Sequence, residues 1–281
     1  MSQQDPKTTP APKPTSPKPK PERVETLRLS SKLTVTVVYE DRYIMAINKP
    51  ANYLIAPVSW EQTSRNLMLM LREGIEMGAP WARRRVLKFI ANIHRLDADT
   101  SGVLLLAKNR LALSKMTDLF ERRQINKTYL ALVRGVAPSE EFSSTESIAE
   151  HPKIAGLMVI DKRNGRESVT NFSVVTQFKH YALLRAMPIT GRTHQIRLHL
   201  ASLGLPVVND SIYSNLDTAN NKLSLPTEPL ISPLPIERLA LHAYELSFKH
   251  PLLQKKIFIQ APLPRDFEQT IKILQKTSTN V

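Results

Sequence analysis

Two carboxylates, an arginine and a histidine lie close together in one stretch of the chain, immediately before an apolar run. This stretch is His94-Arg95-Leu96-Asp97-Ala98-Asp99-Thr100-Ser101-Gly102, and Val103 to Leu106 follow it. A short apolar run bounded by Gly102 and Lys108 is typical of a buried strand, and the residues Thr100 to Gly102 suit a tight turn into it. The polar cluster is therefore expected on a loop held by a rigid strand, which is a common position for reacting groups.

The residue types of this loop allow three interpretations. An ionised Asp97 could act as a nucleophile. Asp97 and Asp99 could instead be the paired carboxylates of a glycoside-type hydrolase, although two acids so close together in one turn are poorly placed for that mechanism. In the third interpretation, which composition alone favours, both acids bond to backbone amides of the turn and Arg95 is their surface partner.

A second group of polar residues spans Thr190 to Leu200. Thr193 is a suitable N-cap for a helix that ends before Gly204. Arg192, His194 and Arg197 would then gather around the positive end of that helix, where an anion is favoured. The sequence therefore predicts a cationic cluster on a loop that enters a helix.

We expect no metal site and no cofactor. His194 and His199 are five residues apart, which places them about 140° apart on a helix, and no acidic residue is adjacent to them. The chain has no cysteine, so thiolate catalysis and cysteine-ligated zinc are excluded. Gly74 and Gly78 form neither of the two nucleotide-binding glycine motifs.

The elements that must position these groups are mostly strands. A strand-rich pattern with strands in runs predicts an α+β fold with a mixed, mostly antiparallel sheet. Strands are expected over residues 33–38, 43–47, 103–106, 127–133, 165–178, 181–186, 239–248 and 256–260. Helices are expected over residues 66–77, 110–122 and 193–203, the second of them capped by Asn109.

Composition points to a polyanionic partner. The net charge of +14 favours nucleic acid, with an anionic membrane surface as the second candidate. The sequence Trp81-Ala82-Arg83-Arg84-Arg85 suits phosphate contact with base stacking, and it equally suits a solvated basic face. With no apolar segment long enough to span a bilayer and no secretory signal, we expect a monomeric cytoplasmic protein that does not enter membranes.

The N-terminal segment differs from the rest of the chain. Seven of the 21 prolines precede residue 25 and alternate with lysines, so residues 1–27 are predicted to be a disordered tail. The tail could gather RNA nonspecifically or could only aid solubility. One catalytic domain is expected over residues 28–272, with a flexible C terminus over residues 273–281.

Four segments resemble the RluA family of RNA pseudouridine synthases. The sequence His-Arg-Leu-Asp-x-x-Thr-Ser-Gly around Asp97 is similar to the family's signature. Residues 39–50 resemble its first motif, although the chain departs from the family pattern after Pro50. Residues 127–133 match Lys-x-Tyr-x-Ala-x-Val, and residues 190–210 resemble its third motif. The tail is too short to hold the S4 domain that some family members carry.

The resemblance implies a pseudouridine-synthase-like domain whose sheet is flanked by helices around a central active-site cleft. It makes Asp97 the nucleophile, places Tyr129 against the target base and pairs Arg197 with the catalytic aspartate. His94, Arg95, Arg192 and His194 are expected to bind RNA and to help extrude the base, with Arg95 a candidate to fill the vacated space. The residue types are compatible with attack at C1′, with attack at C6 and with a glycal intermediate.

The reaction implied is an isomerisation of specific uridines in RNA that needs no ATP, metal or redox partner. Structured ribosomal RNA and transfer RNA are the expected substrates. The alternative is an RNA-binding protein that has kept the fold without the catalysis.

Overall fold

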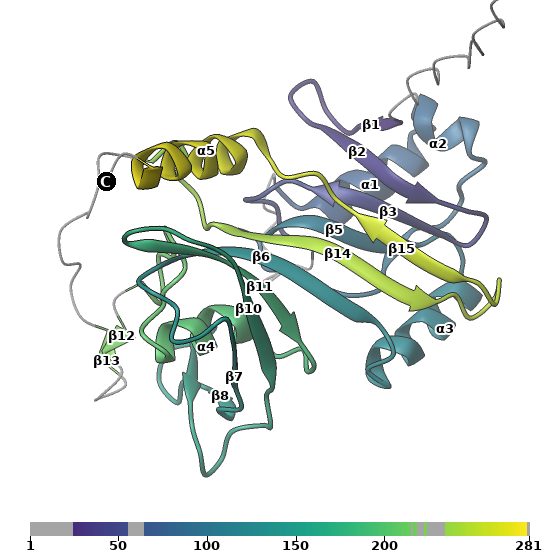
Figure 1. Cartoon of the computed structure of the whole chain (residues 1–281). Coiled ribbons are helices and arrows are strands. Elements are labelled where there is room, and N and C mark those ends of the chain that lie inside the picture. Colours follow the sequence, from purple (N-terminus) through teal and green to yellow (C-terminus); the bar gives the residue numbers. More distant parts are fainter. Residues whose placement is uncertain (1–24, 56–64, 215, 218–221, 224–233, 280–281) are drawn as a thin grey trace, which may run out of the picture.

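A computed structural model describes residues 25–55, 65–214, 216–217, 222–223 and 234–279 (Figure 1). The disorder expected before residue 25 lies outside these residues. Leu27, in the expected tail, is buried in strand β1 (Thr26–Arg28). Helix α5 (Arg265–Thr279) runs past residue 273, where a flexible C terminus was expected, and buries Leu274.

In the part of the chain that the structure describes, eleven strands form one large sheet. Its main path runs in the order β1-β2-β3-β5-β14-β6-β11-β10-β7, with β15 added to β14 and β4 added to β5. The strands after β1 are β2 (Thr34–Glu40), β3 (Ile44–Lys49), β4 (Ala91–Asn92), β5 (Ser101–Ala107), β6 (Asn126–Arg134), β7 (Glu141–Ser144), β10 (Thr170–Gln177), β11 (Tyr181–Pro188), β14 (Leu241–Lys249) and β15 (Lys256–Gln260).

The sheet is mixed and mostly antiparallel, as predicted. The pairing of β5 with β14 is parallel, and the other pairings along the path are antiparallel. Two small hairpins lie outside it: β8 (Ile148–Glu150) with β9 (Met158–Ile160), and β12 (Leu216–Asp217) with β13 (Lys222–Leu223).

One row of residues crosses the centre of the sheet. Lys49 of β3 is paired with Gly102 of β5, Gly102 with Ala243 of β14, and Ala243 with Tyr129 of β6. Gly102 has φ +114°, and a Cβ there would lie 2.1 Å from the carbonyl oxygen of Ala243. A glycine is therefore required where β5 meets β14, at the end of the loop that carries Asp97.

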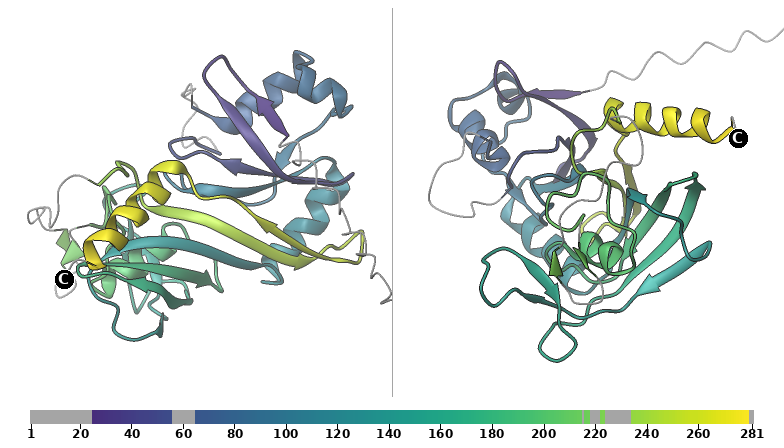
Figure 2. Two further views of the ribbon diagram at one scale, coloured as in Figure 1. Left: turned by 45° about the horizontal axis from the view of Figure 1, so that its top comes forward. Right: turned by 90° about the vertical axis from the view of Figure 1, so that its left-hand side faces the viewer.

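The helices cover the sheet from both sides (Figure 2). They are α1 (Leu67–Glu76), α2 (Pro80–Arg84), α3 (Arg110–Glu121), α4 (Gln195–Ser202) and α5. Asn109 caps α3 as predicted, accepting a hydrogen bond from the backbone N–H of Ala112 at 2.8 Å. Buried side chains of α1 and α2 pack with β1, β3 and β5, whereas α3 packs in the core that contains residues of β14 and β15.

The interpretation of Trp81 as a base-stacking residue is wrong. Trp81 lies on α2 and is 3% exposed, because its ring packs in the core beneath α1. Arg85 forms ion pairs with Glu25 and Glu40, so it serves the fold rather than a nucleic acid.

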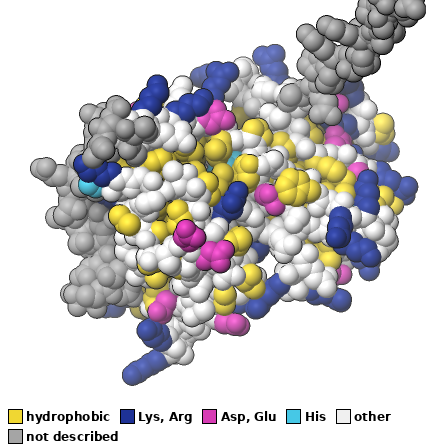
Figure 3. Space-filling model, in the orientation of Figure 1, with side chains coloured by type: hydrophobic (Ala, Val, Ile, Leu, Met, Phe, Trp, Pro, Cys, Tyr) yellow, Lys and Arg dark blue, Asp and Glu magenta, His cyan; other side chains and the backbone are white. Residues whose placement is uncertain are grey.

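Positive charge is spread over the surface. On the face in Figure 3, Lys and Arg side chains lie mainly around the margins, with Asp and Glu between them. No helix of the described residues is both long and apolar enough to span a membrane.

Candidate active site

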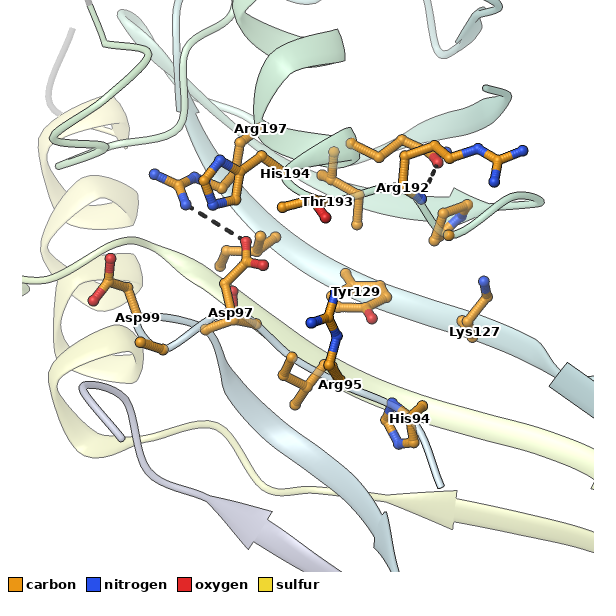
Figure 4. Close-up of a pocket in the computed structure, with 18 of the residues that line it drawn as sticks. His94, Arg95, Asp97, Asp99, Lys127, Tyr129, Arg192, Thr193, His194 and Arg197 are labelled. Atoms are coloured by element: carbon orange, nitrogen blue, oxygen red, sulfur yellow. Dashed lines mark hydrogen bonds and ion pairs between the residues drawn. The ribbon is translucent and has the colours of Figure 1, made fainter. Parts of the chain in front are cut away.

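A cleft of about 450 Å³ opens between the two polar segments singled out in the sequence (Figure 4). The loop before β5 forms one side, the loop that enters α4 forms the opposite side, and β6 lies between them. All seven predicted site residues line this cleft: His94, Arg95, Asp97, Tyr129, Arg192, His194 and Arg197. The fold thus brings together residues as far apart in the sequence as His94 and Arg197.

Arg197 joins two carboxylates from different segments. Its Nε and Nη2 atoms donate to the two carboxylate oxygens of Asp210 at 2.7 and 2.8 Å, while Nη1 lies 3.5 Å from Oδ2 of Asp97. Arg197 is 2% exposed and Asp97 is 26% exposed. The predicted pairing of Arg197 with Asp97 is present, but Asp210 is its closer partner.

Asp210 keeps the buried guanidinium charged. Burial would lower the pKa of Arg197, but the hydrogen bonds and charge of Asp210 outweigh burial and raise it. For Asp210, burial acts in the opposite direction and would raise the pKa. The hydrogen bonds and the charge of Arg197 outweigh burial and lower the pKa of Asp210. A fixed positive charge therefore lies beside the partly exposed carboxylate of Asp97.

The predicted cap of α4 is wrong by one residue. His194, not Thr193, is the N-cap, and it adopts a left-handed conformation with φ +54° without a capping side-chain bond. Its Nδ1 atom lies 2.9 Å from the hydroxyl of Tyr213, which accepts a hydrogen bond from the N–H of Met158. The hydroxyl of Tyr213 therefore links His194 to the backbone at Met158, and burial lowers the pKa of His194.

Tyr129 lies beside Asp97 on the cleft-facing side of β6 (Figure 4). Burial, and then the charge of Asp97, raise the pKa of its phenol. The phenol is therefore protonated at neutral pH and presents an aromatic ring to the cleft.

Lys49 holds the Asp97 loop from behind, a role not anticipated from the sequence. The side chain is fully buried, and Nζ donates to the carbonyl oxygens of Pro50, Tyr53 and Ala98 at 2.8, 3.0 and 2.8 Å. Ala98 lies between the two aspartates, so this bond fixes the loop directly. Burial lowers the pKa of Lys49 to about 7, although the charges of Asp97 and Asp99 oppose that shift.

His94 positions the loop from its other end. Its Nε2 atom accepts a hydrogen bond from the N–H of Leu105 at 3.0 Å, and its ring is stacked on Phe120 with centroids 4.8 Å apart. Burial lowers the pKa of His94 to about 4, which keeps the ring neutral. Nε2 is consequently unavailable to RNA, and the ring anchors the loop to β5.

Arg95 and Arg192 lie on opposite rims of the cleft. Arg95 is exposed, and Arg192 is partly buried. The backbone N–H of Arg192 donates to Oε1 of Gln195 at 2.9 Å, and its Nε donates to the carbonyl oxygen of Glu167 at 3.2 Å. The guanidinium of Arg192 therefore stays at the rim, where a polyanion can reach it.

Four residues that shape the cleft were not assigned a role from the sequence: Lys49, Lys127, Asp210 and Tyr213. Lys49, Lys127 and Asp210 lie within the motif segments quoted above, which was the available signal. Tyr213 lies three residues beyond the last of them, and nothing in its spacing marks it.

The side chain of His199 is buried, and both of its ring nitrogens have partners within the fold. Its two ring nitrogens lie 2.9 Å from the hydroxyl of Thr170 and 2.9 Å from the carbonyl oxygen of Glu146. Among the residues that the structure describes, no three His, Cys, Asp or Glu side chains are grouped so that they could hold a metal ion.

Comparison with known proteins identifies the relatives of the chain. The family model described as RNA pseudouridylate synthase matches residues 43–202. Ribosomal large subunit pseudouridine synthase C of Buchnera aphidicola subsp. Baizongia pistaciae is 33% identical over 257 residues, covering 88% of this chain and 74% of that protein. Synthase D of Zymomonas mobilis subsp. mobilis is 28% identical over 250 residues, covering 88% and 75%.

A solved human structure has a similar fold. Human RNA Pseudouridylate Synthase Domain Containing 4 has a TM-score of 0.66 and 25% sequence identity, with 85% of this chain and 92% of that chain covered. The similarity therefore extends across both halves of the large sheet.

Proposed function

Because the chain belongs to the RNA pseudouridylate synthase family, we propose that it converts uridine to pseudouridine in large-subunit ribosomal RNA, with Asp97 as the nucleophile. The resemblance to RluA-type enzymes is confirmed by these relatives. One observation supports the assignment of Asp97 above the others: its carboxylate is partly exposed in the cleft and lies 3.5 Å from a buried arginine. We also propose that the protein acts as a monomer and that its RNA substrate is structured.

The reaction exchanges one glycosidic bond for another. The bond from ribose C1′ to N1 of uracil breaks, the base turns, and a new bond forms between C1′ and C5. The proton lost from C5 is balanced by the proton gained at N1. Asp97 must be ionised to act as a nucleophile, and Nη1 of Arg197 lies 3.5 Å from its carboxylate.

The target uridine must first leave the RNA stack, at a cost of a few kcal/mol. Tyr129 offers an aromatic face for the extruded base, and its raised pKa favours this stacking role over proton removal by a phenolate. Arg95, exposed at the rim, can occupy the position that the base leaves.

The experiment is to replace Asp97 and measure conversion. Asp97→Asn should abolish tritium release from an unmodified large-subunit ribosomal RNA transcript that carries tritium at C5 of uridine, and it should leave RNA affinity within about twofold. The control is Glu121→Gln, which removes one negative charge from an exposed position on α3. Tritium release that persists in Asp97→Asn would refute the role of Asp97.

The products separate the competing interpretations. A pseudouridine synthase retains the base, whereas a glycoside-type hydrolase would liberate free uracil. A wild-type protein that binds the transcript and releases neither tritium nor uracil would be the inactive RNA-binding protein.

A further inference from the structure

Lys127 has a charged group at the cleft that the reaction chemistry above does not use. It lies two residues before Tyr129 on β6, so both side chains point to the same side of the strand, and both line the cleft. Its Nζ atom donates one hydrogen bond, to the carbonyl oxygen of Thr190 at 3.1 Å. Within the described residues, Lys127 takes part in no ion pair.

This ammonium group is costly to the free protein. Burial, and then the charge of Arg123, lower the pKa of Lys127 to about 8. At neutral pH it is still mostly protonated, yet it has lost part of its hydration without gaining a counter-charge. An anion that entered the cleft would supply that counter-charge.

The neighbouring glycine leaves the ammonium group open. A Cβ built on Gly191 would have Nζ of Lys127 as its only neighbour within 4 Å, at 3.8 Å. The φ angle of Gly191 lies outside the left-handed region, so its backbone conformation does not itself require glycine. The missing side chain keeps space free beside the charge.

The cleft has opposite charges at its two ends. Figure 4 shows Asp97 and Asp99 at one end and Lys127 at the other, with Tyr129 between them. A uridine in RNA carries a phosphodiester group on each side of its ribose. These groups are repelled by the acidic end and attracted by the end that holds Lys127.

We propose that Lys127 is an RNA-binding residue that holds a backbone phosphate adjacent to the target uridine, in the space left open beside Gly191. This inference rests on the proposed function and extends it, because it gives the bound strand a position in the cleft. The Cα atoms of residues 127 and 129 are about 6–7 Å apart along the strand. A phosphate on Lys127 is therefore a near neighbour of a base stacked on Tyr129.

Lysine suits this role as a point charge for phosphate. A partly desolvated ammonium interacts more strongly with an anion than one in bulk water does. Arg123, Arg192 and Arg95 increase the positive potential near this end. Arg123 forms an ion pair with Glu167, and Arg192 donates to the backbone carbonyl oxygen of Glu167. Lys127 is partly buried in the cleft, whereas Arg95 and Arg123 are exposed.

The test compares Lys127→Gln with the wild type in tritium release from the C5-labelled large-subunit transcript. The glutamine can still bond to Thr190 but carries no charge. We expect KM to rise about tenfold, with a smaller change in kcat. Each phosphate contact with single-stranded RNA contributes about 0.7 to the slope of log affinity against log salt. The slope of log kcat/KM should therefore be shallower by about 0.7 in the variant.

Two further variants separate charge from structure. Lys127→Arg keeps the charge, so its KM and its salt slope should be close to those of the wild type. Lys256→Gln removes an exposed charge from β15, away from the cleft, and should leave both near the wild-type values. An unchanged salt slope in Lys127→Gln would overturn the inference, as would an equal loss in the arginine and glutamine variants.

Covering the ammonium group tests the same idea without removing it. Gly191→Leu should raise KM, whereas Gly191→Ala places only one ordinary contact against Nζ and should have a smaller effect. This pair decides the matter if Lys127→Gln fails to fold. Wild-type protein that releases no tritium would defeat the proposed function itself. Wild-type release with salt slopes unaffected by Lys127 would defeat only the phosphate site.

Discussion

Arg197 divides its guanidinium between two aspartates, bonding to both oxygens of Asp210 while lying at a longer distance from Asp97. The contacts to Asp210 are 2.7 and 2.8 Å, and the contact to Asp97 is 3.5 Å. Asp210 therefore fixes the arginine, and the arginine offers its remaining N–H group to the carboxylate in the cleft. A charge that is fixed before substrate arrives needs no reorganisation during the reaction.

Asp210→Asn should damage both stability and catalysis. The variant leaves a buried guanidinium without its charged partner, which is expected to cost about 3–5 kcal/mol of unfolding free energy. We expect kcat for tritium release to fall more than tenfold, because Arg197 loses its fixed position. Urea unfolding and initial rates measure the two effects.

Asp266→Asn is the matched control. Arg238 bonds to both oxygens of Asp266 at 2.8 and 3.0 Å, but Asp266 is 32% exposed. Replacing Asp266 by asparagine should lower the free energy of unfolding by about 1 kcal/mol or less. Equal losses in the two variants would contradict the importance of burial at Asp210.

Gly102→Ala should unfold or strongly destabilise the protein. The new Cβ would lie 2.1 Å from the carbonyl oxygen of Ala243, and the φ angle of residue 102 is +114°. Steric overlap and backbone strain would therefore both destabilise the folded state. We expect a loss of about 3–5 kcal/mol. Gly204→Ala provides the comparison: its φ is +73°, but its Cβ would meet nothing within 4 Å, so a loss of about 1–2 kcal/mol is expected. Similar losses at both positions would show that the contact with β14 is unimportant.

His242 should make stability depend on pH below neutrality. Its ring is buried, with Nδ1 2.9 Å from the hydroxyl of Ser101 and Nε2 3.2 Å from the carbonyl oxygen of Ala261, and burial lowers its pKa from 6.5 to about 4. Between these values the unfolded state binds more protons, so stability rises with pH. The contribution of His242 is complete above pH 6.5 and is lost as pH falls toward 4, by about 1.4 kcal/mol per pH unit.

His242→Gln isolates this contribution. Unfolding free energies from urea titrations at several pH values between 4.5 and 7.5 should fall less steeply with acid in the variant than in the wild type. Parallel curves would mean that His242 does not change its protonation on unfolding.

Lys49→Met should lower kcat by more than its effect on stability explains. The substitution leaves three carbonyl oxygens without their donor, including that of Ala98 between Asp97 and Asp99. Lys108→Met is the control, because Lys108 also bonds to a carbonyl oxygen, that of Asp41, and to Glu40, but does not contact the loop. We expect both variants to melt at a lower temperature, with kcat of the folded protein reduced only in Lys49→Met. Equal kcat values would contradict the positioning role of Lys49.

Much of the fold could be predicted because local patterns agree with it. The apolar run from Val103 to Leu106 lies inside β5, and Asn109 caps α3. The last two strands were also placed correctly, because alternation and flanking turn residues mark them. The cleft between the two polar segments was implied by the resemblance to the RluA family.

The misplaced features depend on tertiary contacts that no local pattern encodes. Thr193 has the better capping side chain, but the chain turns through a left-handed conformation at His194, whose ring bonds to Tyr213. Lys49 looks like a surface residue until the backbone carbonyls of Tyr53 and Ala98 surround it. The position of Trp81 could not be predicted from the sequence, because three arginines follow it closely and indicate an exposed segment.

The parallel pairing of β5 with β14 also bears on the order in which the cleft can be assembled during synthesis. The ribosome synthesises Asp97, Tyr129 and Arg197 well before residues 241–249, yet β14 is the strand inserted between β5 and β6. A nascent chain that ends before β14 contains the proposed site residues but lacks the strand that lies between β5 and β6. We therefore expect a chain truncated before residue 241 to be inactive on RNA.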